Sequence, residues 1–182
     1  MDTVTQYDRI LLWDQSLVGL PCQKISLEQA RELNLRERMM RTCVKYGGVG
    51  VAAPQIGLEL QALMINYEET TRFMLNPEIV ETGEQVSEFW EGCLSLPLCS
   101  AGRAGNKSYQ GGRVTRSDKL TVKYLADTGE EKVEEFTEFT AHIVGHELDH
   151  LSGKFYIEHL NPLERHAVMR KFNRFKKRFE VA

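Results

Sequence analysis

Cysteine is scarce in this sequence, and its arrangement excludes a disulfide framework. Four cysteines are spread over 182 residues, and no two of them form a C-x-x-C pair. Small secreted domains that depend on disulfides carry a denser pattern, so that class is excluded. A bridge between Cys93 and Cys99 is the alternative, but a reducing compartment fits better. At least one thiol is therefore expected to be free to bind a metal. The four are Cys22, Cys43, Cys93 and Cys99.

Long hydrophobic runs, a basic leader and a strong excess of one charge are also missing. No apolar run approaches the ~20 residues that span a bilayer. The chain opens with an acid, Asp2, where a targeting presequence would carry positive charge. The net charge of -3 argues against a surface wholly devoted to nucleic acid. We expect a soluble cytoplasmic protein, folded as one domain over residues 1–182.

Internal repeats and low-complexity tracts are absent, so solenoid and linker architectures are excluded.

A helix is predicted over residues 26–46, because Ser26 and Gln29 form a capping box and Gly47 is a stop signal. Alternating or short apolar runs predict strands at 60–66, 72–76 (closed by Pro77) and 119–125.

The most informative stretch lies on a helix predicted over residues 137–151. His146 and His150 are four residues apart, so they share one helix face and can reach a single divalent metal, while Glu147 addresses a water bound to it. Two surface histidines beside an acidic turn are the alternative. His142 falls on the same face, but three successive i+4 ligands on a straight helix cannot easily surround one ion. We expect it to support the site or line a pocket wall.

The third ligand of such a site must come from elsewhere in the chain. Metzincin proteases use a histidine at a position that is Tyr156 here. Thermolysin-like proteases use a glutamate on a later helix, for which Glu164 and Glu180 are poorly placed. Neither protease class fits well, so the third ligand stays open at this point.

Three motifs bring a family into view, and they occur in order along the chain. They are GVGVAAPQIG at 48–57, EGCLS at 91–95 and HELDHLSG at 146–153. Together they closely resemble the signature motifs of the peptide deformylases. The likeness also reaches LNPE at 75–78 and covers nearly the whole chain from about Asp8 onward.

The resemblance implies an α+β fold, with small mixed or antiparallel sheets around the central HExxH-bearing helix and a helix at the C-terminus. It implies that Cys93, His146 and His150 bind the metal. Three protein ligands and one open position are typical of a catalytic site. It also implies that Glu147 takes a proton from the attacking water and passes it to the departing amine.

Further roles follow from the same resemblance. The side-chain amide of Gln55 and the backbone N–H of Leu94 are implied to stabilise the oxyanion of the tetrahedral intermediate. Val49, Gly50 and Gly92 are implied to bind the substrate. Glycines permit the close approach of a peptide backbone, which agrees with this role, although an ordinary glycine-rich turn is the alternative.

The implied reaction is removal of the formyl group from the N-terminal methionine of newly made proteins. One thiolate and two imidazoles would hold iron(II), zinc, nickel or cobalt, and we expect iron(II), which the family often uses. A zinc endopeptidase indifferent to Cys93 is one rival. A weakly active deformylase-like protein that chiefly binds ribosomes is another.

Two departures from the family pattern bear on rate and substrate range. Gly145 stands where the family usually has glutamine, and the segment 98–113 is longer than usual. That segment is rich in glycine and has no periodicity, so it is either a loop covering the site or a solvated insertion. Arg116 stands where the family has an arginine, and we expect it to pair with Glu91 in support of the site; an exposed, unpaired arginine is the alternative.

A basic helix is predicted over residues 162–180. Between positions 162 and 182 there are seven Lys or Arg against two Glu. An apolar stripe at helical spacing should pack on the body of the protein, with the cations in solvent. A merely solvated face is one reading; attraction to ribosomal RNA, as in similar deformylases, is the other. The stripe consists of Val168, Phe172, Phe175 and Phe179.

Overall fold

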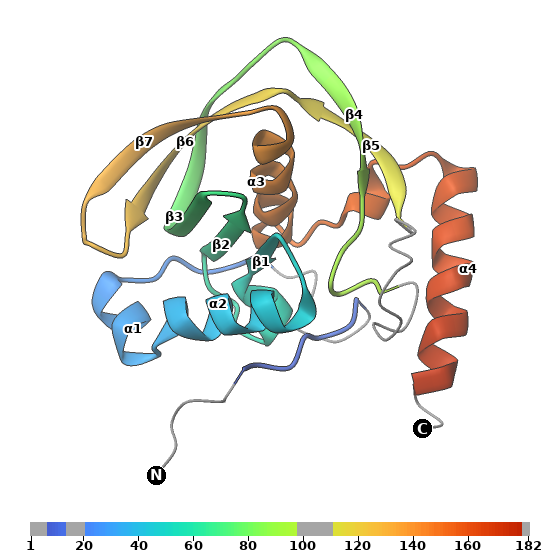
Figure 1. The fold of residues 1–182 in the computed structure, drawn as a ribbon, viewed down its shortest axis with the longest axis horizontal. Coiled ribbons are helices and arrows are strands. Elements are labelled where there is room, and N and C mark those ends of the chain that lie inside the picture. Colours follow the sequence, from blue (N-terminus) through green and yellow to red (C-terminus); the bar gives the residue numbers. More distant parts are fainter. Residues whose placement is uncertain (1–6, 14–20, 98–110, 180–182) are drawn as a thin grey trace.

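The computed structural model describes residues 7–13, 21–97 and 111–179 (Figure 1). Two helices precede the strands, a third follows them, and a fourth ends the described chain. The α-helices are α1 (Leu27–Glu32), α2 (Leu35–Tyr46), α3 (Glu138–Leu151) and α4 (Pro162–Phe179). The strands are β1 (Gly50–Ala52), β2 (Ala62–Tyr67), β3 (Thr70–Thr82), β4 (Val86–Glu91), β5 (Gly112–Ser117), β6 (Lys119–Ala126) and β7 (Glu131–Thr137). Two short 3-10 helices are η1 (Ala53–Ile56) and η2 (Tyr156–Glu158).

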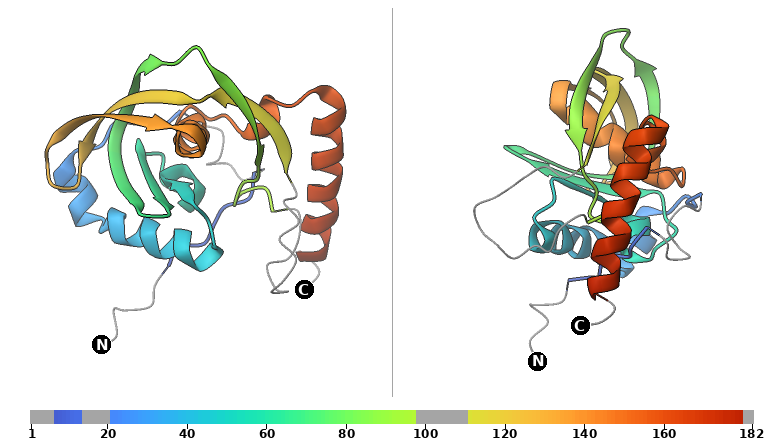
Figure 2. Two further views of the ribbon diagram at one scale, coloured as in Figure 1. Left: turned by 45° about the horizontal axis from the view of Figure 1, so that its top comes forward. Right: turned by 90° about the vertical axis from the view of Figure 1, so that its right-hand side faces the viewer.

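The strands form two antiparallel sheets around α3, which confirms the predicted α+β class. One sheet has the order β1-β2-β3-β6-β7, and the other is the pair β4-β5. In Figures 1 and 2, α3 lies in the middle of the molecule, with the larger sheet on one side and β4-β5 on the other. This central helix is the one that carries the HELDH motif.

The larger sheet is covered on both faces, and β2 shows why its sequence is a continuous apolar run. Leu63 and Ile65 belong to the core cluster shared with α3, whereas Ala62 and Met64 belong to the cluster shared with α1 and α2. Successive side chains of a strand point to opposite faces, so a strand between two layers of helices is apolar at every position. Burial of these residues fixes β1 and β2 against α3.

The predicted helix over 26–46 is in fact two helices, which corrects that expectation. The capping box at Ser26 and the stop at Gly47, with φ of 67°, are both present. Between them, Asn34 adopts a left-handed conformation with φ of 49° and breaks the helix. Asparagine is among the few residues that tolerate this conformation, and leucine and methionine periodicity on either side hides the break.

Strand β3 continues through Pro77 to Thr82, so the expectation that Pro77 closes it was wrong. The pairing register with β6 shifts between Leu75 and Glu78, which indicates a bulge at the proline. Because proline has no N–H to donate, a bulge is where a sheet can accept it. The Asn76 side chain exchanges two hydrogen bonds of 2.8 Å with the Ile25 backbone and holds the bulge in place.

The remaining strand predictions differ in outcome. β2 and β6 confirm the strands predicted at 60–66 and 119–125 to within two residues. β1, β4, β5 and β7 were not predicted. The end of the proposed loop 98–113 belongs to β5, and residues 98–110 lie outside the described part of the chain.

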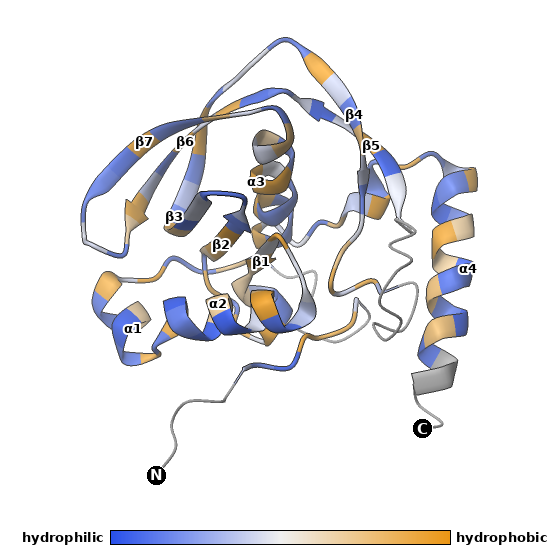
Figure 3. Cartoon of the chain, in the orientation of Figure 1, coloured by the Kyte–Doolittle hydropathy of each residue, from blue (hydrophilic) through white to orange (hydrophobic). Residues whose placement is uncertain are grey.

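Helix α4 packs beside β5 and η2 through the predicted apolar stripe (Figures 1 and 3). Val168 and Phe172 are buried and Phe175 is half-buried. The side chain of Phe179 lies outside the described residues. None of the described helices combines the length and apolar composition that crossing a membrane requires.

Candidate metal centre and active site

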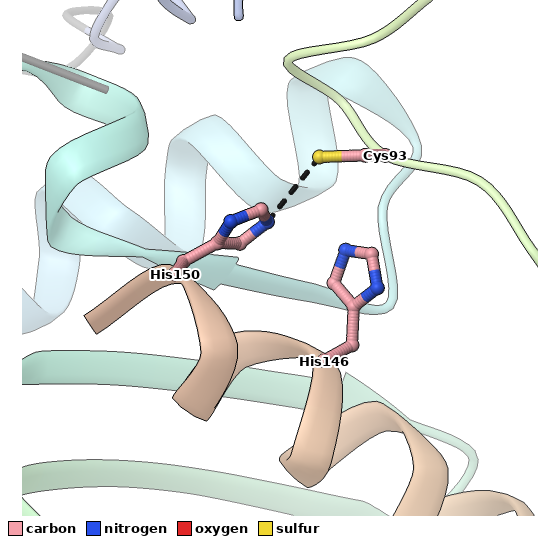
Figure 4. A group of neighbouring side chains, drawn as sticks. All are labelled: Cys93, His146 and His150. Carbon is pink, nitrogen blue, oxygen red and sulfur yellow. Dashed lines mark hydrogen bonds between the residues drawn. The ribbon is translucent and has the colours of Figure 1, made fainter. Parts of the chain in front are cut away.

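The structure brings the three predicted ligands together. His146 and His150 project from one face of α3, and Cys93 comes from the segment that follows β4 (Figure 4). One ligand atom from each of the three lies within 4.8 Å of the others, and the Cys93 Sγ is 3.3 Å from the His150 Nε2. Both histidines are buried and Cys93 is half-buried. A thiol and two imidazoles at this spacing suit a tetrahedral divalent metal.

Each imidazole is oriented by a hydrogen bond at its other nitrogen. The His146 Nδ1 is 2.8 Å from the Glu91 Oε2, and the His150 Nδ1 is 3.1 Å from the backbone carbonyl of Lys154. Both acceptors favour a proton on Nδ1, which leaves each Nε2 lone pair free toward Cys93. Such contacts fix the tautomer and orientation of metal-binding histidines.

Hydrogen bonds from His146 and Arg116 keep the side chain of Glu91 ionised. Burial alone would raise its pKa, but hydrogen bonds from His146 and Arg116 lower the pKa of Glu91 to about 2. The Arg116 guanidinium donates from Nε to Oε1 at 2.6 Å and from Nη2 to Oε2 at 3.0 Å. The predicted pairing of Arg116 with Glu91 is thereby confirmed, and it supports the ring of His146.

Glu147 is the residue next to His146, and one of its carboxylate oxygens is unpaired in the described part of the chain. Among the described residues, no group hydrogen-bonds to its buried Oε2. Burial is the main cause that raises the pKa of Glu147 to about 7. Gly50 packs directly on this side chain: a Cβ at position 50 would lie 2.4 Å from the Glu147 Oε1. A carboxylate with a free oxygen and a pKa near neutrality is suited to exchange a proton with a reacting group.

Gln55 is buried in η1 and directs its amide nitrogen at the same cluster. Its Oε1 accepts a 2.8 Å hydrogen bond from the Ala52 N–H, which fixes the orientation of the amide. The Nε2 therefore faces the Cys93 Sγ at 3.4 Å and the Ser95 Oγ at 3.3 Å. Leu94 follows Cys93, and its side chain reaches Gly48, where an added Cβ would lie 2.9 Å from the Leu94 Cδ1.

The three predicted substrate-binding residues come from two segments, the start of β1 and the segment after β4. Val49 and Gly50 lead into β1, whose partner in the described part of the chain is β2, so β1 is an edge strand. Val49 is 40% exposed. Gly92 follows β4, and a Cβ there would meet no described atom within 4 Å. An edge strand therefore lies beside Glu147, and an open glycine adjoins Cys93.

Comparison with known proteins decides the family. A family model described as polypeptide deformylase matches residues 7–166. The chain belongs to the polypeptide deformylase family. Among curated relatives, the peptide deformylase of Agrobacterium fabrum is 33% identical over 150 residues, covering 80% of this chain and 82% of its own.

Solved structures agree with this assignment. A peptide deformylase from Legionella pneumophila aligns with a TM-score of 0.84 and 29% identity, over 97% of this chain and 99% of its own. An actinonin-bound class I type b peptide deformylase from Acinetobacter baumannii aligns with a TM-score of 0.74 and 29% identity, over 85% and 99%. This deformylase is thus a metal-dependent hydrolase that removes the N-formyl group from the N-terminal formylmethionine of newly synthesised proteins.

An ion-pair network that the sequence analysis missed extends behind the deformylase site. The Arg116 Nη1 donates to the Asp149 Oδ2 at 2.8 Å, and the His159 Nε2 is 2.8 Å from the same oxygen. Arg116 and Asp149 are largely buried. Asp149 stands inside the HELDH motif, which was the only signal for it. His159 carries no local signal, because its role depends on the fold bringing the end of η2 beside Asp149 of α3.

Gly145, which stands where the family usually has glutamine, lies beside Arg116. A Cβ at position 145 would lie 3.4 Å from the Arg116 Cδ and 3.5 Å from the Leu120 Cδ1, which is ordinary contact. A methyl group therefore fits there without moving the arginine that holds Glu91.

Proposed function

We propose that Cys93, His146 and His150 bind the catalytic metal of this deformylase. The observation that carries this proposal is the convergence of one sulfur and two ring nitrogens within 4.8 Å. Iron(II) is the proposed native metal, and zinc, nickel and cobalt suit the same donors. When bound, such a metal lowers the pKa of a coordinated water and polarises the formyl oxygen.

Glu147 is the proposed general base and acid. Its buried Oε2, to which no described residue hydrogen-bonds, belongs to the residue next to His146. With a pKa raised to about 7, the carboxylate can accept a proton from water and return it to the departing amine at neutral pH. One side chain then serves both proton transfers.

Gln55 and the backbone N–H of Leu94 are the proposed oxyanion donors. The Gln55 amide is already oriented by the Ala52 N–H, so its NH2 group needs no reorganisation when negative charge develops. Loss of one such donor typically costs about 2.7–4 kcal/mol of transition-state stabilisation.

The substrate is proposed to bind as an extended peptide between the edge strand β1 and the segment after β4. Val49 and Gly50 offer backbone groups on one side and Gly92 on the other. Main-chain pairing at a sheet edge accepts varied sequences, which suits an enzyme that acts on many nascent chains.

Helix α4 is the proposed contact with ribosomal RNA. Arg170, Lys171 and Arg174 are exposed on the side away from the buried Val168 and Phe172. Phosphate contacts of this kind weaken steeply with salt. Because formylated chains emerge from ribosomes, we infer a cytoplasmic enzyme, with one catalytic domain over residues 1–182 and a basic helix over 162–180.

Ribosome binding is tested by co-sedimentation at rising salt. The variant R170E/K171E should lose binding, whereas K24E/K45E, which reverses two exposed lysines elsewhere, should retain it. Binding by R170E/K171E at the wild-type level would contradict the α4 proposal and leave the metal site untouched.

The site proposal is tested with a formyl-Met peptide and an unformylated peptide of the same length. Wild-type enzyme prepared without oxygen should release formate and contain one metal ion per chain. Glu147→Gln should keep the metal and lose activity, Cys93→Ala should lose the metal, and Glu138→Gln, at the start of the same helix, should behave as wild type. Cleavage of internal peptide bonds, or full metal content in Cys93→Ala, would contradict the proposal.

A further inference from the structure

Strand β4 presents three side chains toward α3 and runs directly into the metal-ligand segment. Ser87, Phe89 and Glu91 alternate with the exposed Val86, Glu88 and Trp90. Because the strand period is two, the first three share one face. Glu91 is the group that orients His146, and Cys93 follows two residues later. The placement of β4 on α3 therefore determines the position of the proposed ligand Cys93. It also determines the position of Glu91, which orients the proposed ligand His146.

His142 is the side chain of α3 that meets all three. Its Nε2 is 3.1 Å from the Ser87 Oγ, and its ring contacts the Phe89 ring edge-to-face with centroids 4.5 Å apart. Its Nδ1 lies 3.9 Å from the Glu91 Oε1. The side chain is only 1% exposed, so each of these contacts is shielded from water.

The contact between Ser87 and Asp118 settles the direction of the hydrogen bond between Ser87 and His142. Ser87 also contacts the Asp118 carboxylate, to which its hydroxyl must donate. The Ser87 oxygen then accepts from His142, which places the ring proton on Nε2. Both oxygens of Glu91 already accept from His146 and Arg116, and the His142 Nδ1, which carries no proton in this tautomer, has no hydrogen-bond partner among the described residues. His142 is thus anchored through Ser87 and Asp118 and abuts Glu91.

We propose that His142 is a positioning residue for the deformylase reaction. Together with Ser87 and Asp118, it fixes the inner face of β4 on α3. It thereby keeps Glu91 in contact with His146, and it keeps Cys93 at the metal site. This inference rests on the ligand set proposed above. An aliphatic residue of similar size would fill the space but would leave the Ser87 hydroxyl and the strand without this anchor.

The test compares four variants under conditions where circular dichroism shows an intact fold. His142→Leu removes the ring nitrogens, His142→Gln places an amide N–H near the position of Nε2, and Ser87→Ala removes the oxygen that Nε2 meets. Glu88→Gln is the matched control, because Glu88 lies on the outer face of β4, paired with Arg113. The readouts are the rate of metal release to an excess of chelator, and kcat and KM on a formyl-Met peptide.

Groups that orient metal ligands typically contribute 10–100-fold to metal affinity or activity. We expect His142→Leu to release metal about 10-fold faster and to lose kcat rather than KM. Ser87→Ala should shift in the same direction, His142→Gln should recover most of the loss, and Glu88→Gln should match wild type. If His142→Leu does not fold, Ser87→Ala decides alone.

Metal release and kcat at wild-type levels in folded His142→Leu and Ser87→Ala, with only thermal stability lowered, would overturn the inference and reduce His142 to a packing role. The metal content of Cys93→Ala, measured alongside, separates a failure of the proposed ligand set from a failure of the proposed role of His142. If Cys93→Ala keeps its metal, the ligand set itself is wrong. If it loses the metal while His142→Leu retains it, only the role of His142 fails.

Discussion

At the scale of single residues, the site combines groups whose charge states are set by opposite means. Glu91 is kept ionised by His146 and Arg116 despite its burial. Glu147 has a free oxygen, and burial dominates its pKa. Two carboxylates on neighbouring elements are thereby suited to different tasks, one to orient a ligand and one to move protons.

The raised pKa of Glu147 predicts a pH-dependent cost to the stability of the metal-free protein. In the folded state the group titrates near pH 7, and in the unfolded state near its ordinary value of 4.5. Below pH 4.5 it is protonated in both states and costs nothing. Between pH 4.5 and 7 the unfolded state loses its proton first, so stability falls as pH rises.

Urea unfolding of metal-free wild type and Glu147→Gln at pH 4.5 and pH 8 measures this cost. The advantage of the glutamine variant should grow by about 3 kcal/mol between the two pH values. The same advantage at both pH values would show that the carboxyl group is not held in a disfavoured charged state.

Gly50 should be intolerant of any side chain, because Glu147 occupies the space of a Cβ. We expect Gly50→Ala to displace the carboxylate and to lower kcat by about 100-fold or more, the usual contribution of a positioned base. The double variant Gly50→Ala/Glu147→Gln should be no slower than Glu147→Gln alone, since both act through one group. Fully multiplicative losses in steady-state kinetics would contradict this mechanism.

The sequence predicted the three side chains that the structure brings together, but not their surroundings. The HELDH spacing identified His146 and His150, and the family resemblance supplied Cys93. Asp149 and His159 were missed, because Asp149 pairs with Arg116 of β5 and with His159 after η2, and only the fold brings these residues together.

At the scale of elements, α3 carries most of the site and has one weak point. Gly145 lies in its interior, where glycine costs roughly 1 kcal/mol relative to alanine. The surrounding atoms leave room for a methyl group. Gly145→Ala should therefore raise the free energy of unfolding by about 0.5–1 kcal/mol, measured by urea denaturation at constant metal content. A loss of stability would show that the helix must approach Arg116 without a Cβ.

The elements that the sequence failed to predict share a physical cause. Alternation in β6 and the capping box at Ser26 are local signals, and both held. The break at Asn34 and the continuation of β3 past Pro77 depend on a left-handed residue and on a bulge, which tertiary contacts stabilise. Strand β4 was missed because its inward residues include Ser87 and Glu91, whose burial makes sense only beside α3.

At the scale of the whole molecule, α4 is joined to the site by a shared core. Val168 and Phe172 pack with Val114 of β5 and the residues of η2, close to the ion pair of His159 with Asp149. We therefore expect metal-free protein to unfold in one transition. Phe172→Ala should lower the free energy of unfolding by about 3–5 kcal/mol, whereas the exposed Val44→Ala should change it little. A separate early transition for α4, seen by circular dichroism, would contradict a single folding unit.

The central claim is that one thiolate and two imidazoles hold a single metal ion. X-ray absorption on the metal-loaded protein measures this directly. With zinc, we expect one sulfur at about 2.3 Å and two nitrogens at about 2.0–2.1 Å, and loss of the sulfur shell in Cys93→Ser. A metal shell of oxygen and nitrogen alone in the wild-type protein would contradict the account.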